Sequence, residues 1–312
     1  MSKKASLFLC FLALSLFVLV SCGRKNRWQT STLFYFDTII EVRLLCGPQE
    51  LERADQAVSA LFSEVEALFS PQKEDLSSPL VLELHSRAEK IYQDTSGCFD
   101  ITVEPLSLLW GFREKTYRIP KDEDIRSVLP LIGMSRIKKE GARLVLQPGM
   151  MLDWGGIAKG YSVDMAASCL IEMGFERGYI NAGGDLFCWG DNPFSGAWRI
   201  GIKHPRTQGF IGILSLSGAA AATTGDYIRY FEQDGRRYHH IFNPGTGYPA
   251  KGKQSVTVIG PETLVCDALA TALFVCPDPE DILSRYPQYG AIIVLDSGET
   301  QVLGKKFAFD PV

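Results

Sequence analysis

The sequence predicts an α+β fold. Segments with apolar residues at helical spacing are mixed with segments that alternate like strands, without the strict strand–helix–strand order of a doubly wound sheet. The 312 residues are 46% hydrophobic and 22% charged, which is ordinary globular composition. That length allows one large domain or two intimate ones, and no fixed short repeat, low-complexity tract or obvious linker interrupts the chain. We expect a single domain over residues 32–312.

The helices are predicted from apolar spacing and from residues that favour helix ends. In the first helix, Leu51, Ala54 and Val58 repeat at the intervals of an amphipathic helix. The second opens with Pro79, which fits the first helical position. The predicted helices cover residues 50–69, 79–93, 157–173 and 263–275, with a short one near residues 125–129.

The strands are predicted from short apolar or alternating runs bounded by turn residues. A hairpin is indicated where residues 226–232 alternate, Asp234-Gly235 forms a tight turn and residues 237–242 return. The returning strand carries His239 and His240, and alternation places these two side chains on opposite faces. The other predicted strands cover residues 33–45, 143–146, 150–153, 179–180, 198–203, 211–216, 255–259, 291–295 and 301–303, the last two forming a hairpin.

The N-terminus resembles a secretory signal. Lysines precede an apolar run over residues 7–20, which is short for a membrane-spanning helix. The run ends in Leu-Val-Ser-Cys at residues 19–22, which resembles the bacterial lipobox. We therefore expect removal of residues 1–21, lipidation of Cys22 and a basic tether over residues 22–31, with the protein anchored to the inner membrane and facing the periplasm. An ordinary signal peptide with an accidental cysteine is the alternative.

Charge and cysteine content argue against nucleic acid as a partner and against a structural zinc site. The formal net charge is −4 and no long basic block lies beyond the extreme N-terminus, so nucleic acid is not an expected partner. Of the 8 cysteines, Cys10 would leave with the signal and Cys22 would be lipidated. The others form no Cys-x-x-Cys pair, so a structural zinc site is not expected. Their disulfide connectivity stays open, and several lie in apolar runs where buried free thiols are common.

A glycine turn at the start of the third predicted helix indicates a site for phosphate. Gly155 and Gly156 allow close approach of the backbone to a ligand, and Lys159 lies in the first helical turn. Exposed amides, the helix dipole and this cation together suit an anion. Asp153 either binds a polar ligand group or holds the loop by accepting its amides. The alternative is a plain strand-to-helix turn with a solvated lysine.

The predicted helix over residues 263–275 carries a candidate metal site. Asp267 and Thr271 are four residues apart and therefore share one helix face. A carboxylate, a hydroxyl and a nearby backbone carbonyl are oxygen ligands that suit Mg²⁺, which usually also meets substrate phosphates. The alternative is that Asp267 caps the helix while Thr271 bonds back to a carbonyl.

Together with the histidine segment, these motifs closely resemble the ApbE-type flavin transferases, the FAD:protein FMN transferases. The resemblance runs from about residue 34 to the C-terminus, in the family's order. It implies an α+β architecture similar to the tunnelling fold. The matching stretches are residues 97–102, 108–112, 153–161, 181–185, 223–249 and 255–274.

The resemblance implies that FMN is transferred from FAD to a threonine of an exported or membrane target protein, with release of AMP and a requirement for Mg²⁺. Charge neutralisation at the phosphate oxygens is what such a reaction chiefly needs. By resemblance, Asp267, Thr271 and the Gly156 carbonyl bind the metal. His240 acts at the pyrophosphate, as proton relay or as stabiliser of developing charge. The residues expected to contact FAD are Phe36, Cys98, Phe99, Asp100, Asp153, Lys159, His240 and Ile241.

The chain departs from the family pattern at two places. Phe36-Asp37-Thr38 stands where the family's first strand usually has a motif of Met-Gly-Thr type, which affects the expected contact from Phe36. Asn243 stands where the family often has Asp. Asn starts a turn as well as Asp does, so only a role for a carboxylate is lost there.

Two other functions compete with FMN transfer. An FAD pyrophosphatase would use the same site with water in place of the threonine hydroxyl, and the difference would lie in how well water is excluded. A flavin-binding lipoprotein would store or deliver the cofactor without chemistry. Asp267, Thr271 and His240 argue against passive binding, which needs no metal at the pyrophosphate.

Overall fold

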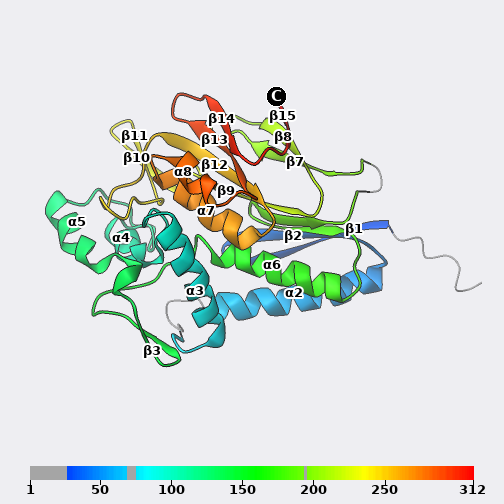
Figure 1. The fold of residues 1–312 in the computed structure, drawn as a ribbon, viewed down its shortest axis with the longest axis horizontal. Helices are drawn as coiled ribbons and strands as arrows, with labels where there is room; N and C mark the ends of the chain where they lie inside the picture. The colour runs from blue at the N-terminus through cyan, green and yellow to red at the C-terminus, as the bar shows by residue number, and fades with distance from the viewer. Residues whose placement is uncertain (1–26, 69–74, 193–194) are drawn as a thin grey trace, which may run out of the picture.

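The computed structural model describes residues 27–68, 75–192 and 195–312 and confirms the predicted α+β fold (Figure 1). The expected signal peptide, residues 1–21, and Cys22 lie outside the described residues. Among the helices of the described ranges, none is both long enough and apolar enough to cross a membrane.

An eight-stranded antiparallel sheet forms the centre of the molecule, in the order β1-β2-β5-β6-β9-β12-β13-β14. Strand β6 pairs with β5, its neighbour in sequence, and also with β9, which is distant in sequence, so the ends of these three strands lie together. The strands are β1 (Arg27–Tyr35), β2 (Thr38–Cys46), β5 (Gly178–Ala182), β6 (Asp185–Trp189), β9 (Ala219–Gly225), β12 (Lys253–Gly260), β13 (Gly290–Leu295) and β14 (Thr300–Gly304).

Helices cover one face of this sheet (Figure 1). Helix α2 packs on β1 and β2, α6 on β5 and β6, and α7 on β9 and β12, while α3 lies against α7. The apolar positions that predict these helices supply the buried side chains, as with Ala54 and Val58 of α2. The helices are α2 (Pro48–Leu68), α3 (Pro79–Asp94), α4 (Glu104–Leu109), α5 (Asp122–Val128), α6 (Ala158–Glu172), α7 (Thr263–Val275) and α8 (Pro279–Ser284).

A smaller sheet of order β15-β8-β7 covers part of the opposite face. Leu186 of the large sheet and Trp198 and Leu214 of the small one share a buried cluster between the two. Its strands are β7 (Trp198–Lys203), β8 (Phe210–Leu216) and β15 (Ala308–Pro311). Two hairpins complete the described strands, β3 (Lys138–Glu140) with β4 (Arg143–Val145) and β10 (Tyr230–Gln233) with β11 (Arg236–His239).

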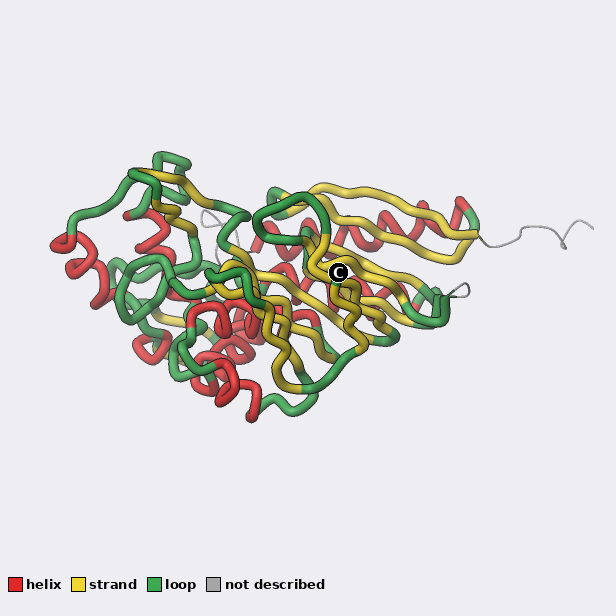
Figure 2. Tube along the Cα trace, turned by 90° about the horizontal axis from the view of Figure 1, so that it is seen from above, coloured by secondary structure: helices red, strands yellow, loops and turns green. Residues whose placement is uncertain are grey.

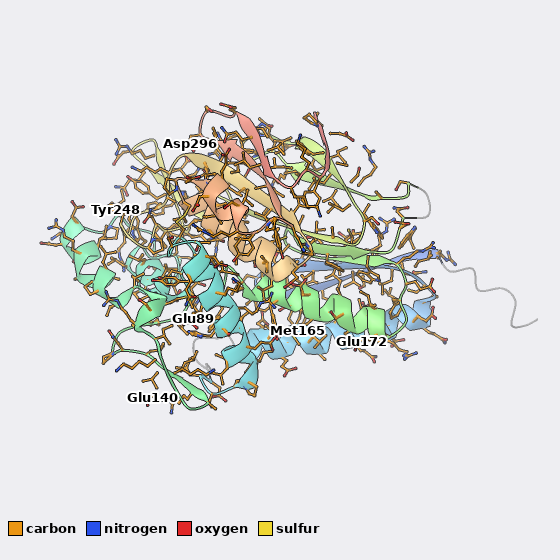
Figure 3. All side chains as sticks on the ribbon, in the orientation of Figure 1. Glu89, Glu140, Met165, Glu172, Tyr248 and Asp296 are labelled. Carbon is orange, nitrogen blue, oxygen red and sulfur yellow. A yellow bond between two sulfur atoms is a disulfide. The ribbon has the colours of Figure 1, made fainter. Side chains whose placement is uncertain are left out.

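The end of the molecule that carries α4 and α5 is rich in loops (Figure 2). Trp110 is fully buried there and donates its indole N–H to the carbonyl of Gly247 at 3.0 Å. Tyr248, labelled in Figure 3, donates its hydroxyl to Asp122 of α5 at 2.5 Å. The turn after the histidines is thereby fixed to the loop-rich end.

Most predicted elements are confirmed. Helix α7 has the predicted bounds, α2, α3 and α6 agree within two residues, and β13 pairs with β14 as the predicted hairpin. The Asp-Gly turn is also present, with positive φ of 52° at Asp234 and 71° at Gly235. Periodicity and turn residues are local signals, and here the tertiary structure follows them.

The prediction of one strand over residues 33–45 is wrong. The chain turns at Phe36 and Asp37, which have positive φ of 52° and 54°, and β1 pairs back on β2. The Phe36 amide donates to Glu66 of α2 at 2.6 Å, so a tertiary contact supports the turn. Neither glycine nor proline marks it, and the apolar pattern therefore reads as continuous. Because β1 begins at Arg27, the second half of the expected tether, residues 27–31, is part of this strand.

Two further strand predictions are wrong. Residues 150–153 form no strand, because Asp153 donates its amide to Ile101 at 2.6 Å and its side chain accepts from the loop that follows. The hairpin strands are shorter than predicted: the first begins at Tyr230 rather than at residue 226, and the second ends at His239 rather than at residue 242. Asp226 is instead buried beside β12: its amide donates to the Gln254 carbonyl at 3.0 Å, and its carboxylate accepts two hydrogen bonds from Arg206, at 2.7 and 2.6 Å.

Candidate active site

A buried cluster of charges lies where α6, β6 and α7 meet. Lys159, in the first turn of α6, donates from Nζ to Asp185 Oδ2 at 2.5 Å and to Asp267 Oδ2 at 3.5 Å. The amide of Gly160 donates to the same Asp267 oxygen at 3.2 Å. Asp185 is the first residue of β6 and Asp267 lies in α7, and both carboxylates are buried. The ends of three elements therefore build one ionic centre.

The charges in this centre influence one another's ionisation. Burial opposes the charge on Lys159, but the carboxylates of Asp185 and Asp267 outweigh it and raise the pKa of the ammonium group. Burial, followed by the negative charge of Asp185, raises the pKa of Asp267. With both carboxylates ionised, one negative charge remains unbalanced by Lys159. A buried excess of negative charge favours a bound cation.

Gly156 and Thr271, two of the expected metal ligands, are neighbours in the structure. A Cβ placed on Gly156 would lie 3.4 Å from Thr271 Oγ1, so the glycine backbone and this hydroxyl are neighbours. Thr271 Oγ1 is also 3.1 Å from Thr224 Oγ1 of β9. Within the described ranges, no group of three or more His, Cys, Asp or Glu side chains is placed to hold a metal. The one carboxylate, one hydroxyl and one carbonyl fit a cation that shares its remaining positions with substrate phosphates, as Mg²⁺ does.

The glycine turn before α6 is held by Asp153. Its Oδ1 accepts the amide of Gly155 at 2.8 Å, which is the loop-holding contact considered for this residue. Lys159 Nζ lies 3.5 Å from the Gly155 carbonyl. The turn thus directs Gly156 toward α7 and places the first turn of α6 over the charge centre.

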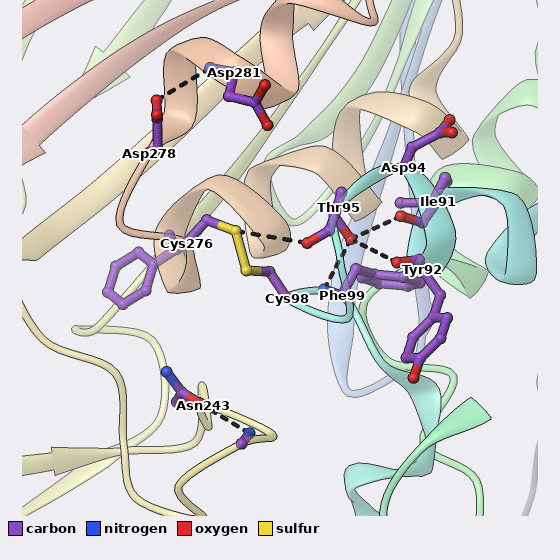
Figure 4. Close-up of a disulfide and its surroundings, with 12 residues drawn as sticks. Ile91, Tyr92, Asp94, Thr95, Cys98, Phe99, Asn243, Cys276, Asp278 and Asp281 are labelled. Carbon is purple, nitrogen blue, oxygen red and sulfur yellow. Dashed lines mark hydrogen bonds between the residues drawn. A yellow bond between two sulfur atoms is a disulfide. The ribbon is translucent and has the colours of Figure 1, made fainter. Parts of the chain in front are cut away.

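The loop of Cys98, Phe99 and Asp100 lies next to this turn. Phe99 is buried, and its Cε2 would be 3.3 Å from a Cβ on Gly156. Asp100 caps the short 3-10 helix at Ile101–Val103 and accepts from Thr102 N at 2.8 Å and Thr102 Oγ1 at 2.6 Å. Burial raises the pKa of Asp100, although the bonds from Thr102 oppose the rise. Cys98 forms a disulfide with Cys276 (Figure 4).

The two histidines have separate surroundings and point different ways, although only His239 lies on β11 and His240 follows the end of that strand. The His239 ring is buried, meets Phe274 edge-on and lies 2.9 Å from the Ala250 carbonyl through Nε2. Its Nδ1 accepts the amide of Ile241 at 3.2 Å, so Nε2 carries the proton. This histidine and the buried backbone of Ile241 hold the strand end in place.

His240 is oriented by the backbone of Arg229, which directly precedes β10. Its Nδ1 lies 3.1 Å from the Arg229 carbonyl, which can only accept, so Nδ1 is the donor and Nε2 is left as an acceptor. Burial lowers the pKa of His240 to about 3, and the charges of Arg229 and Lys159 act in the same direction. The ring is therefore neutral, and the lone pair on Nε2 can accept a hydrogen bond.

Phe36 lies in the β1–β2 turn, with its ring against Phe62 of α2. Thr38, the first residue of β2, packs against Gly183. A Cβ added to Gly183 would lie 2.4 Å from Thr38 Oγ1. Gly183 has a positive φ of 62° and lies just before Asp185. The turn that carries Phe36 is therefore packed beside the charge centre.

Two features of the candidate site were not predicted from the sequence. The first is the position of Asp185 in the charge centre, although its segment, residues 181–185, belongs to the matching stretches and ends a strand with two glycines. An acidic residue after such a turn is a usable signal. The pairing of Cys98 with Cys276 has no sequence signal, since the two are separated by 178 residues.

Comparison with known proteins identifies the family of this fold. The ApbE family model matches residues 36–293. An FAD:protein FMN transferase of Klebsiella pneumoniae (strain 342) is 36% identical over 195 residues, which span 61% of this chain and 59% of that relative's length. The ApbE protein of Thermotoga maritima superposes with a TM-score of 0.82 at 31% identity, covering 88% of this chain and 96% of that one. The apo form of Pseudomonas stutzeri flavinyl transferase ApbE gives a TM-score of 0.78 at 30% identity, covering 89% and 95% respectively. The chain belongs to the ApbE family.

Proposed function

We propose that this protein transfers FMN from FAD to a threonine hydroxyl of a target protein and releases AMP, in a reaction that requires Mg²⁺. The observation that carries the proposal is the buried centre of Lys159, Asp185 and Asp267 at the start of α6. Burial lowers the pKa of the neutral His240 ring, and the charge of Lys159 also contributes to this lowering. The names of the related proteins, FAD:protein FMN transferase and flavinyl transferase, support the same reaction.

Different residues of the chain bind the metal, supply positive charge to the phosphates and accept the proton in the proposed phosphoryl transfer. Asp267, Thr271 and the Gly156 carbonyl would hold Mg²⁺, which supplies neutralising charge to the pyrophosphate oxygens. Lys159 supplies a positive charge beside the same oxygens. His240 Nε2 accepts the proton of the threonine hydroxyl as the new oxygen–phosphorus bond forms. The bond between the FMN phosphorus and the bridging oxygen breaks, and AMP leaves with that oxygen.

The remaining predicted FAD contacts are part of the same proposal. Phe99 and Ile241 belong to one buried apolar cluster, Phe36 packs against it, and all three suit the flavin or adenine ring. Cys98 and Asp100 shape the loop beside Gly156. Asp153 fixes the glycine turn that the phosphates would approach. Each of these roles in FAD binding is part of the proposal.

The test is incubation of the purified protein with FAD, Mg²⁺ and an exported candidate target that contains an acceptor threonine. We expect AMP in solution and a target whose mass increases by one FMN on threonine. AMP that accumulates while the target stays unlabelled would contradict transfer and identify an FAD pyrophosphatase. A matched variant, Asp267→Ala, separates catalysis from storage, because a pure flavin binder would keep its FAD affinity.

We also propose that the protein is an exported lipoprotein, anchored through Cys22 to the inner membrane and facing the periplasm. The lipobox-like sequence supports this location, and so does the Cys98–Cys276 disulfide, because disulfides persist mainly in oxidising compartments. Labelling with a palmitate analogue is expected to mark the wild-type chain and not Cys22→Ser. Equal labelling of the two proteins, or none of the wild type, would contradict lipidation.

A further inference from the structure

The Cys98–Cys276 disulfide joins the two segments that meet at the proposed FAD site (Figure 4). Cys98 directly precedes Phe99, whose ring lies against Gly156. Cys276 follows the last residue of α7, the helix that carries Asp267 and Thr271. One covalent bond thus links the loop on one side of Gly156 to the helix on the other side.

Noncovalent contacts fix each partner of this disulfide to a different part of the fold. On the loop side, the Phe99 amide donates to Thr95 Oγ1 at 3.2 Å, and Thr95 Oγ1 donates to Ile91 of α3 at 2.7 Å. On the helix side, buried Lys253 of β12 donates to the Cys276 carbonyl at 2.6 Å. The loop is therefore held by α3, the end of α7 is held by the sheet, and the disulfide ties these two units together.

We propose that this disulfide is a positioning element for the FAD site: it keeps the Phe99 loop against Gly156 and Thr271, so the oxidised protein binds FAD more tightly than the reduced one. The inference rests on the proposed function. Its physical basis is that Phe99 is one residue from the bridge and Thr271 is less than two helical turns from it. Small displacements are transmitted directly over such short, well-packed segments.

Reduction of the bridge is chemically simple. A thiolate of dithiothreitol attacks one sulfur, and the second thiol of the reagent then displaces the mixed disulfide. Two electrons and two protons pass to the protein, which gains the Cys98 and Cys276 thiols, and the reagent becomes a cyclic disulfide. Cys98 is half-buried and Cys276 is buried, so Cys98 is the sulfur that the reagent reaches first.

The test measures the KM and Kd for FAD of the purified protein before and after reduction, with the thiols counted by alkylation and mass spectrometry. Reduction is expected to raise both constants about tenfold while the circular dichroism spectrum stays that of the folded protein. If the bridge only stabilises the fold, its reduction would lower the unfolding temperature and leave both constants unchanged. Unchanged constants in reduced, folded protein would therefore overturn the proposal.

Variants separate the bridge from the side chain of Cys98 itself. Cys276→Ser, Cys98→Ser and the double variant are expected to share the same raised KM, and dithiothreitol should have no further effect on them. Cys169→Ser is the matched control, because Cys169 is a free, partly exposed cysteine of α6. It should behave like wild type in both redox states. A loss confined to Cys98→Ser would assign the effect to a contact of that side chain and reject the positioning role of the bridge.

Failure of the proposed function gives a different pattern. Oxidised protein that binds FAD but forms neither AMP nor labelled target would reject catalysis, while the Kd from flavin fluorescence would still test the bridge. Oxidised protein that does not bind FAD would reject both ideas together.

Discussion

At the scale of single residues, the charge balance around Lys159 determines how the site can bind a cation. Asp185 is the closer partner of the ammonium group, at 2.5 Å, and Asp267 lies 3.5 Å from it. The ammonium group of Lys159 therefore pairs mainly with Asp185 and only weakly with Asp267. This arrangement leaves the Asp267 carboxylate available to the metal that the proposed reaction needs.

Replacement of Asp185 tests this division of roles. In Asp185→Asn, Lys159 loses its closest charged partner and pairs more strongly with Asp267, in competition with Mg²⁺. We expect the Mg²⁺ concentration for half-maximal AMP release to rise about tenfold, a change that matches the free energy of about one hydrogen bond to a charged group. Asp310→Asn, at an exposed position of β15, is the control. A variant that loses turnover with an unchanged Mg²⁺ requirement would show that Asp185 acts in another way.

The ionisation of His240 gives a second prediction at this scale. Burial, aided by the charge of Arg229, lowers its pKa from 6.5 to about 3, so the folded protein keeps the ring neutral where the unfolded chain takes up a proton. Its contribution to stability is fully present above pH 6.5 and is lost as the pH falls from 6.5 toward 3. Urea unfolding of wild type should show this loss, and His240→Gln should show less of it. If the free energy of unfolding changed with pH by the same amount in the two proteins, the His240 ring would be exposed to solvent and the prediction would be wrong.

At the scale of elements, the contact between α6 and α7 sets the geometry of the site. Gly160 of α6 lies so close to α7 that a Cβ would be 2.6 Å from the Thr263 carbonyl and 2.8 Å from Leu264 Cα. Its amide also binds Asp267. A glycine is required because backbone meets backbone there, and the two helices bring Lys159 and Asp267 together only at this separation.

Gly160→Ala is therefore expected to separate the two helices at the site. Helix propensity alone would make alanine stabilising by about 1 kcal/mol, but the clash with backbone atoms outweighs that gain. We expect lower stability toward urea and a loss of turnover of about a hundredfold, since misplacement on this scale is costly to catalysis. Gly245→Ala is the control, because only the Asn243 side chain lies near its added Cβ, at 3.4 Å. Wild-type activity of Gly160→Ala would contradict the proposed dependence on helix contact.

At the scale of the whole molecule, the order of the large sheet assembles the site from distant segments. Strand β2 pairs with β5, β6 with β9, and β9 with β12, so turns that are far apart in sequence meet at one place. The covering helices then add Lys159 from α6 and Asp267 from α7. The disulfide closes the same assembly between residues separated by 178 positions.

The disulfide should also stabilise the molecule, apart from any effect on FAD. A bridge over a separation of 178 residues restricts the unfolded chain strongly, and a stabilisation of about 4 kcal/mol is expected. Urea unfolding of Cys98→Ser/Cys276→Ser against wild type measures the difference. Cys169→Ser, which keeps the bridge, should unfold like wild type. A difference below about 1 kcal/mol would mean that the unfolded chain gains little freedom when the bridge is absent.

The sequence by itself determined the α+β class, the long helices, the Asp-Gly hairpin, the opposite directions of His239 and His240, and the family. These features depend on periodicity, turn residues and ordered motifs, all of which are local. Only the tertiary structure decided the turn at Phe36, the pairing of Lys159 with Asp185, and the bridge from Cys98 to Cys276. Each of these depends on groups brought together by strand order and helix packing, and neither spacing nor composition encodes such proximity in a single chain.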